Sequence, residues 1–396
     1  MSRLLHLLCA GWLLALAACQ SDPPSQVAPP PIAAPVVAKV DTVRPEASPP
    51  PYTGPVELTV KLPRYLRSHR RYVGTLGGQE IVVELLPVDN PYQLSISSLY
   101  FVRDPHTELF SGALVGAGKQ TKSLKLEMYA DTATISLVLL PPFGSQLRAL
   151  WSAGPGTAPQ PMMLHEDYTD AVRYEVLTAT AKGPPIPSGD EAGSIPSYTR
   201  TYLHLLGSDT LRPGRRRLQA LTPRRMQKAV RYYLRHEAEG GCSDTEELHV
   251  SLNGYDLLSY QLVFYSYMFG GNHPEATEDF RTVDLRTGRP THWETWFRAD
   301  AEPALRQLIY RRLLATDGTE GFYSGSFDQK TGMQELPGQY GLTPAGILAH
   351  YGDYVLGPHA RGPVSVLLPF AEVAPLLNQG TLLDRILKAR GLRAGR

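Results

Sequence analysis

The stretch Leu-Leu-Ser-Tyr-Gln-Leu-Val-Phe-Tyr-Ser-Tyr-Met-Phe-Gly-Gly-Asn-His-Pro-Glu, residues 257–275, decides how the C-terminal half of the chain folds. Its first part, Leu257–Met268, is rich in aromatic and aliphatic side chains, which predicts a β-strand. A second such run, Glu247–Asn253, precedes it across a Gly-Tyr-Asp turn, and Thr282–Leu285 follows as a further strand. Gly270-Gly271 permits the positive φ angles at which a strand can end. We therefore expect consecutive antiparallel strands here.

The histidine and glutamate of this turn, His273 and Glu275, are the first candidates for chemistry. A zinc site needs three or four ligands, often spaced as His-x-x-x-His or His-Glu-x-x-His. His273 has neither spacing, and the next histidine, His292, lies beyond a predicted strand. Asn272 and Pro274 suit a tight turn. We expect a structural turn held by His273, with no metal site, no cofactor and no catalytic residue; contact of His273 and Glu275 with a partner is the alternative.

Periodic patterns in the rest of the C-terminal half predict a domain of mixed strands and helices over residues 171–378. The expected helices are Thr222–Glu237, Pro303–Leu314 and Phe370–Leu377, and the further expected strands are Ala171–Thr180, Ile347–Tyr351 and Val364–Leu368. Residues 379–396 predict a short helix with a basic tail. The fold class is therefore α+β: a β-rich antiparallel N-terminal domain followed by an α+β domain with an antiparallel sheet and packed helices.

Residues 56–170 are expected to form the N-terminal domain as an all-β meander. Apolar and polar residues alternate in Leu124-Lys125-Leu126-Glu127-Met128, as a half-buried antiparallel strand requires. About 100 residues are enough for one hydrophobic core. The clearest predicted strands are Gln79–Leu86, Leu94–Val102, Ser123–Tyr129, Thr132–Leu140 and Leu147–Ser152.

One predicted helix, Thr222–Glu237, carries two faces of different character. Its apolar face is formed by Met226, Ala229, Val230, Tyr233 and Leu234, and its basic face by Arg224, Lys228, Arg231 and Arg235. Arg215-Arg216-Arg217 precedes the helix and extends the local positive charge. A solvated helix face explains this pattern, and the alternative is a docking surface for an acidic partner, an anionic glycan or lipid headgroups.

Four sequence blocks occur in order in the C-terminal half: 257–260, 267–274, 284–288 and 341–370, the last containing Leu-Gly-Pro-His-Ala-Arg-Gly-Pro at 356–363. Together they resemble the C-terminal extracytoplasmic domain shared by the anti-sigma factor RsiV and the deacetylase PdaC. The resemblance implies a domain that is not itself the deacetylase, and one that binds lysozyme in RsiV-like proteins. The N-terminal strands resemble β-rich segments of envelope lipoproteins, which implies a shape and no catalytic residues.

The N-terminus predicts where the protein is located. Residues 1–18 combine Arg3 with a short apolar run that ends in Leu-Ala-Ala before Cys19, the pattern of a bacterial lipobox. We expect cleavage after residue 18 and lipidation of Cys19; an ordinary secretory signal with an incidental cysteine is the alternative. Eleven of the 33 residues 23–55 are proline, so residues 19–55 predict an extended spacer. The expected location is the cell envelope, with the membrane reached through the lipid.

Charge and cysteine content narrow the function classes. The chain has 39 basic and 38 acidic residues, which argues against a nucleic-acid partner. Beyond Cys19, Cys242 stands alone and is most simply a structural thiol. We predict a non-catalytic envelope lipoprotein that binds a protein or glycan, such as lysozyme or peptidoglycan. The alternatives are a wall-polymer hydrolase with His273 and Glu275 in its site, and a purely structural envelope component.

Overall fold

The structure is a computed structural model, and the chain divides into two units, Met1–Val56 and Glu57–Arg396. It describes residues 66, 68–88, 93–103, 112–117, 123–130, 133–154, 156–183, 195–206, 215, 223–236, 242–268, 273–316, 318 and 320–393. The predicted signal sequence, Cys19, the spacer and the turn residues 269–272 lie outside these ranges. Among the helices in these ranges, none combines the length and the apolar composition of a membrane span.

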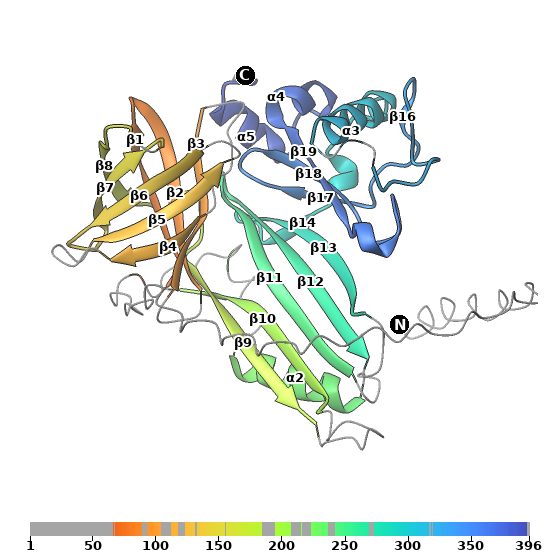
Figure 1. The fold of residues 1–396 in the computed structure, drawn as a ribbon, viewed down its shortest axis with the longest axis horizontal. Helices are drawn as coiled ribbons and strands as arrows, with labels where there is room; N and C mark the ends of the chain where they lie inside the picture. The colour runs from red at the N-terminus through yellow and green to blue at the C-terminus, as the bar shows by residue number, and fades with distance from the viewer. Residues whose placement is uncertain are drawn as a thin grey trace, which may run out of the picture. The chain divides into compact units, whose positions relative to one another are not determined.

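Eight antiparallel strands form a closed barrel in the N-terminal part of the described chain (Figure 1). They are β1 (Arg70–Leu76), β2 (Gln79–Val88), β3 (Gln93–Phe101), β4 (Gly112–Ala117), β5 (Leu124–Ala130), β6 (Ala133–Leu140), β7 (Gln146–Ser152) and β8 (Gln160–Glu166). Each strand pairs with the next, and β1 pairs with β8 through Tyr72↔Glu166. Strands β2, β3, β5, β6 and β7 were predicted from the sequence, whereas β1, β4 and β8 were not. Closure was not predicted either, because it depends on β1 and β8 meeting across the whole domain.

The barrel interior is filled by the inward-facing residues of these strands. Along β7 every second residue, Leu147, Ala149 and Trp151, is buried, which is the period that a strand requires. They join one apolar cluster with residues from β1, β2, β5, β6 and β8. The alternation read from the sequence is therefore the pattern that builds this core.

A six-stranded sheet follows, in the order β14-β13-β12-β11-β10-β9 (Figure 1). Its strands are β9 (Tyr174–Lys182), β10 (Ser197–Leu205), β11 (Cys242–Gly254), β12 (Leu257–Met268), β13 (Glu275–Asp284) and β14 (Arg289–Thr291). The pair β10–β11 is parallel, which corrects the expectation of a wholly antiparallel sheet. Helix α2 (Pro223–His236) lies in the connection between them, as parallel neighbours require a long crossover.

Strand β13 is longer than the sequence predicted. It begins at Glu275 instead of Thr282, and pairs with β12 from Ser266↔Glu275 to Leu257↔Asp284. The residues gained, 275–281, are mostly polar, so their sequence resembles a loop although they form a strand at the border of the sheet. A tight turn follows Asp284, where Gly288 has φ of 68° and β14 returns beside β13.

A three-stranded antiparallel sheet and short helices complete the chain. The strands are β17 (Gln339–Leu342), β18 (Gly346–Tyr351) and β19 (Val364–Pro369), with a minor pair β15 (Phe327–Asp328) and β16 (Gly332–Met333). The helices are α3 (Glu302–Thr316), α4 (Phe370–Val373) and α5 (Leu383–Ala389), with single 3-10 turns at Trp293–Thr295, His359–Arg361 and Ala374–Leu376. The predicted helix 370–377 is thus divided. The described chain is strand-rich with few helices.

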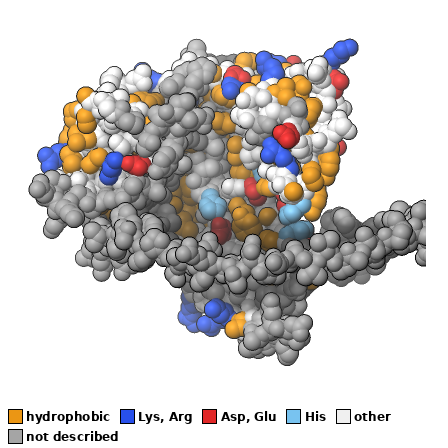
Figure 2. Space-filling view, in the orientation of Figure 1, with side chains coloured by type: hydrophobic (Ala, Val, Ile, Leu, Met, Phe, Trp, Pro, Cys, Tyr) orange, Lys and Arg blue, Asp and Glu red, His pale blue; other side chains and the backbone are white. Residues whose placement is uncertain are grey.

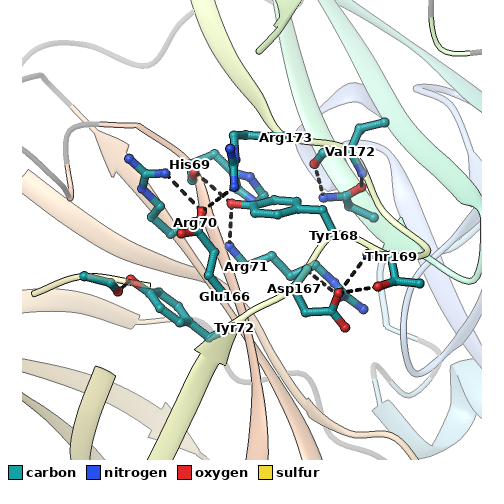
Figure 3. A network of polar contacts seen from close by, with 12 residues as sticks. His69, Arg70, Arg71, Tyr72, Glu166, Asp167, Tyr168, Thr169, Val172 and Arg173 are labelled. Carbon is teal, nitrogen blue, oxygen red and sulfur yellow. Dashed lines mark hydrogen bonds and ion pairs between the residues drawn. The ribbon is translucent and has the colours of Figure 1, made fainter. Parts of the chain in front are cut away.

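The segment between β8 and β9 is bonded to the first barrel strand (Figure 3). The Tyr168 hydroxyl accepts a hydrogen bond of 3.1 Å from the Arg71 backbone N–H, and the Asp167 carbonyl accepts one of 2.9 Å from the Arg71 guanidinium. Glu166 receives ion pairs from Arg70 and Arg173 at 3.0 and 3.1 Å. The Arg173 guanidinium also lies 4.5 Å from the centroid of the Tyr168 ring. These contacts fix the chain where the barrel ends.

The turn after β13 is organised by a buried carboxylate, Asp284. It accepts hydrogen bonds from Arg385 Nη1 at 2.7 Å, Thr287 Oγ1 at 3.0 Å and the Arg286 backbone N–H at 3.2 Å. Burial acts to raise the pKa of Asp284, but these hydrogen bonds outweigh it and lower the pKa below its usual value. Asp284 therefore joins the β13–β14 turn to helix α5.

Replacing this carboxylate should destabilise the domain in a pH-dependent way. Because the folded pKa is lowered, the stabilisation by Asp284 is full above the unfolded pKa of about 3.9 and is lost as pH falls through the folded pKa. We expect Asp284→Asn to lower the free energy of unfolding at pH 7 by about 2 kcal/mol. Urea unfolding at pH 7 and pH 3 measures it. If Asp284→Asn lowered the free energy of unfolding equally at both pH values, the stabilising role of the Asp284 carboxylate would be contradicted. The control is Asp300→Asn, which changes an exposed carboxylate.

Candidate ligand groove

A cavity of about 520 Å³ opens between the start of β13 and the β18–β19 connection, and we call it the groove. Its lining comes from three stretches that are far apart in sequence: the turn into β13, the start of β17, and the residues that end and follow β18. The lining residues are His273, Glu275, Ala276, Thr277, Glu278, Gly338, Gln339, His350, Tyr351, Gly352, Asp353, Tyr354, Val355 and His359. Figure 2 shows histidine side chains gathered beside acidic and hydrophobic ones on the face it presents.

One wall of the groove is a stack of rings. The rings of His273 and His359 lie with centroids 4.0 Å apart and planes 25° apart. Tyr354 stacks on the His359 ring at 5.5 Å and 24°. The Tyr354 side chain is 55% exposed, so part of its surface is available to a ligand. The predicted hydrogen bond of His273 to its own loop is also present, between Nδ1 and the Pro274 carbonyl oxygen at 3.1 Å.

Carboxylates supply the charge of the groove. Glu275 is exposed at the start of β13, whereas the side chains of Glu278 and Asp353 are 15% and 13% exposed. Among the described residues that line the groove, none is lysine or arginine. Asp353 Oδ2 lies 3.5 Å from Nδ1 of His359. At neutral pH with uncharged histidines, the lining therefore carries an excess of negative charge.

His350 forms the floor of the groove and is 3% exposed. Its Nδ1 lies 2.9 Å from Ser365 Oγ and 3.5 Å from Glu278 Oε2. Within the described chain, its Nε2 and the Asp353 Oδ1 are buried and have no hydrogen-bond partner. Buried polar atoms normally have partners, so two unsatisfied atoms in one cavity indicate a place where a ligand could bind.

The protonation of His350 should make the domain less stable in mild acid. Burial lowers the pKa of His350, and Glu278 and Asp353 raise it by less. The unfolded chain therefore binds this proton more readily, and stability falls as pH drops below about 6.5. Between pH 7 and pH 5, the variant His350→Gln should lose less of its free energy of unfolding than the unsubstituted protein loses. Urea midpoints at both pH values measure it. The control is His292→Gln, at an exposed site. If the urea midpoint changed with pH equally in His350→Gln and in this control, the expectation would be contradicted.

The basic face predicted on the helix lies away from the groove. Arg224, Lys228 and Arg231 are exposed on α2, and Arg235 is part of the same helix. Helix α2 packs on β9 and β10, at the opposite side of the six-stranded sheet from β13. The structure therefore does not bring these cations together with His273 and Glu275.

The two faces of this helix differ in part from the prediction. Met226 and Val230 are buried, and Tyr233 stacks near Tyr198 with centroids 4.2 Å apart. Ala229 is exposed and lies outside the buried face. Arg215, which the sequence assigned to the basic patch, is 1% exposed and belongs to the interior. Burial of so large a cation could not be read from the run of three arginines.

Sequence reasoning missed most of the groove. The sequence pattern pointed to neither Glu278 nor Asp353. His350 and His359 stand nine residues apart, a spacing that does not place two histidines on one helix face. A β-hairpin connection brings them into the same cavity instead. The available signal was the Leu-Gly-Pro-His block at 356–359. Within the described chain, no cluster of three or more histidine, cysteine or acidic side chains is arranged to hold a metal ion.

Comparison with known proteins identifies part of the chain. The family described as "Protein of unknown function (DUF3298)" matches residues 296–371. Residues 296–371 form a DUF3298 domain. This DUF3298 domain contributes His350, Asp353, Tyr354 and His359 to the groove, whereas β13 precedes it. No curated protein matches the chain.

Two crystal structures of DUF3298 proteins are similar to this chain. One, from Bacteroides fragilis, is 20% identical, covers 55% of this chain and 99% of its own, and has a TM-score of 0.41. The other, from Pseudomonas aeruginosa PAO1, is 19% identical, covers 54% and 97%, and also has a TM-score of 0.41.

Proposed function

We propose that this chain is a lipid-anchored envelope protein whose groove binds a protein or glycan partner without chemical turnover. The groove carries the proposal, because it combines stacked rings, carboxylates and two buried polar atoms without partners. Aromatic faces bind apolar ligand surfaces, and a few convergent polar groups orient the ligand. The lipobox at Cys19 and the proline-rich residues 23–55 support a tethered location in the periplasm or at the cell surface.

The resemblance of the four sequence blocks supports the class of partner. We propose that residues 171–378 as a whole correspond to the extracytoplasmic domain of RsiV-like and PdaC-like proteins. In this proposal the domain recognises a wall component or a protein that acts on the wall. Nucleic acid is not a proposed partner, since the charge of the chain is balanced.

The test is retention of the purified full chain, in detergent, on peptidoglycan and on immobilised lysozyme. We expect saturable binding to one of them, and loss of that binding in the double variant His273→Ala/Tyr354→Ala. The variant Arg224→Ala/Lys228→Ala, on the basic face of α2, is the matched control and should bind normally. Absence of saturable binding to either probe would contradict the proposal and favour a structural envelope component.

A hydrolase acting on wall polymer is the second candidate. The groove does bring His273 and Glu275 together with a further acid and histidine, Glu278 and His350, as a hydrolase would require. Incubation of the full chain with peptidoglycan, followed by analysis of released fragments, separates the two functions. We expect no release. Turnover that disappears in His273→Ala, with folding retained, would establish the hydrolase.

A further inference from the structure

The N-terminal half of strand β13, beside the groove, has no neighbouring strand on its outer side in the described part of the chain. β14 pairs with β13 through Thr282–Asp284, and in the described part of the chain no strand pairs with residues 275–281 on that side. The lining of the groove includes Glu275, Ala276, Thr277 and Glu278 from this half. An unpaired strand edge is a template for another extended chain.

A side chain already shows that this edge can be bound. The carboxamide of Gln339 donates to the Glu278 carbonyl oxygen at 2.8 Å and accepts from the Phe280 N–H at 2.8 Å. In an antiparallel strand, both polar groups of every second residue point to the same side. The Ala276 C=O and the Glu278 N–H therefore point outward as well. Within the described residues, no hydrogen-bond partner is seen for either group.

The charge beside this edge selects the side chain that an extended ligand would carry. Glu275, Glu278 and Asp353 all line the groove, without a described lysine or arginine among its lining residues. Asp353 Oδ1 is buried without a partner and can accept a charge-assisted hydrogen bond. The exposed face of Tyr354 can contact a cation or its methylene stem. These features fit a lysine or arginine side chain.

We propose that the ligand of the groove is an extended peptide segment of a partner protein. Its backbone pairs with β13 at Ala276 and Glu278, and one of its lysine or arginine side chains enters the groove toward Asp353. This inference rests on the proposed binding function and names the chemistry of its ligand. It makes the groove a β-strand acceptor with an acidic pocket, in which main-chain hydrogen bonds give affinity and the pocket gives specificity.

The experiment uses the full chain in detergent and a blocked seven-residue peptide of alternating threonine and valine with a central lysine. Two control peptides isolate the two parts of the proposal: one has glutamate in place of lysine, and the other is N-methylated at alternate amides. Glu275→Gln/Asp353→Asn removes charge from the groove, and Ala276→Pro obstructs the edge, where proline is tolerated. Glu294→Gln, an exposed carboxylate outside the groove, is the matched control. Circular dichroism checks the fold of each variant.

We expect saturable binding of the lysine peptide, weakened about tenfold or more by the double variant and lost in Ala276→Pro, with Glu294→Gln unchanged. Neither control peptide should bind. Equal binding of the N-methylated peptide would overturn the strand pairing, and equal binding of the glutamate peptide would overturn the acidic pocket. Capture of peptidoglycan in a groove-dependent manner, without peptide binding, would overturn this inference while leaving the proposed function intact. Failure of every probe would overturn both.

Discussion

Leu368→Ala should lower the free energy of unfolding by about 3 kcal/mol, within the range that truncation of a buried leucine produces. Leu368 lies on β19, is 0% exposed, and pairs with Ile347 on β18. It belongs to the cluster that joins this sheet to α3, α4 and α5. Removing its side chain leaves a cavity behind the strands whose connection forms the groove.

The adjacent residue provides the control, because Leu367 is on the opposite face of the same strand and is 36% exposed. Leu367→Ala should change the free energy of unfolding by no more than about 0.5 kcal/mol. Urea unfolding followed by tryptophan fluorescence is suitable, since Trp293 packs against the buried Tyr340 with ring centroids 4.8 Å apart. Equal losses in both variants would contradict the register of β19.

Gly346→Ala should destabilise the same sheet by about 2–3 kcal/mol through steric overlap. A Cβ atom at Gly346 would lie 2.1 Å from the carbonyl oxygen of Leu368 and 2.9 Å from the Cα of Pro369. These are backbone atoms of the paired strand, so no side-chain rotation can relieve the overlap. The β18–β19 pairing must shift, and the groove residues that follow β18 should move with it.

Gly352→Ala is the matched control for this effect. Gly352 also follows β18, and a Cβ there would meet no heavy atom within 4 Å. We expect the free energy of unfolding to stay equal or to rise slightly, because alanine restricts the unfolded chain. The two variants are compared by urea unfolding. A Gly346→Ala protein as stable as Gly352→Ala would contradict the close approach of β18 and β19.

Elements determined by local pattern could be predicted from the sequence. Strand β12 has the predicted bounds, Leu257–Met268, and helix α2 differs from Thr222–Glu237 by one residue at each end. Pairings between distant segments could not be predicted. The closure of the barrel by β1 and β8 and the parallel pair β10–β11 depend on which strands meet, which periodicity does not encode.

The side chains of the groove show the same difference between local features, which the sequence reveals, and long-range contacts, which it does not. The sequence identified His273 and Glu275, because they stand on a visible turn. It could not identify His359 as the neighbour of His273, since the two rings meet only when β13 and the β18–β19 connection come together. Glu278 was hidden because its polar segment resembled a loop, although it continues the strand.

Hydrogen–deuterium exchange of the full chain, with and without the partner that it retains, tests most directly whether the groove is the binding site. We predict that saturation with peptidoglycan or lysozyme slows exchange in residues 273–280 and 352–359. Helix α2, which carries Arg224, Lys228 and Arg231, should exchange at the same rate in both states. Protection of α2 with unchanged exchange in 273–280 and 352–359 would contradict the account and assign binding to the basic face.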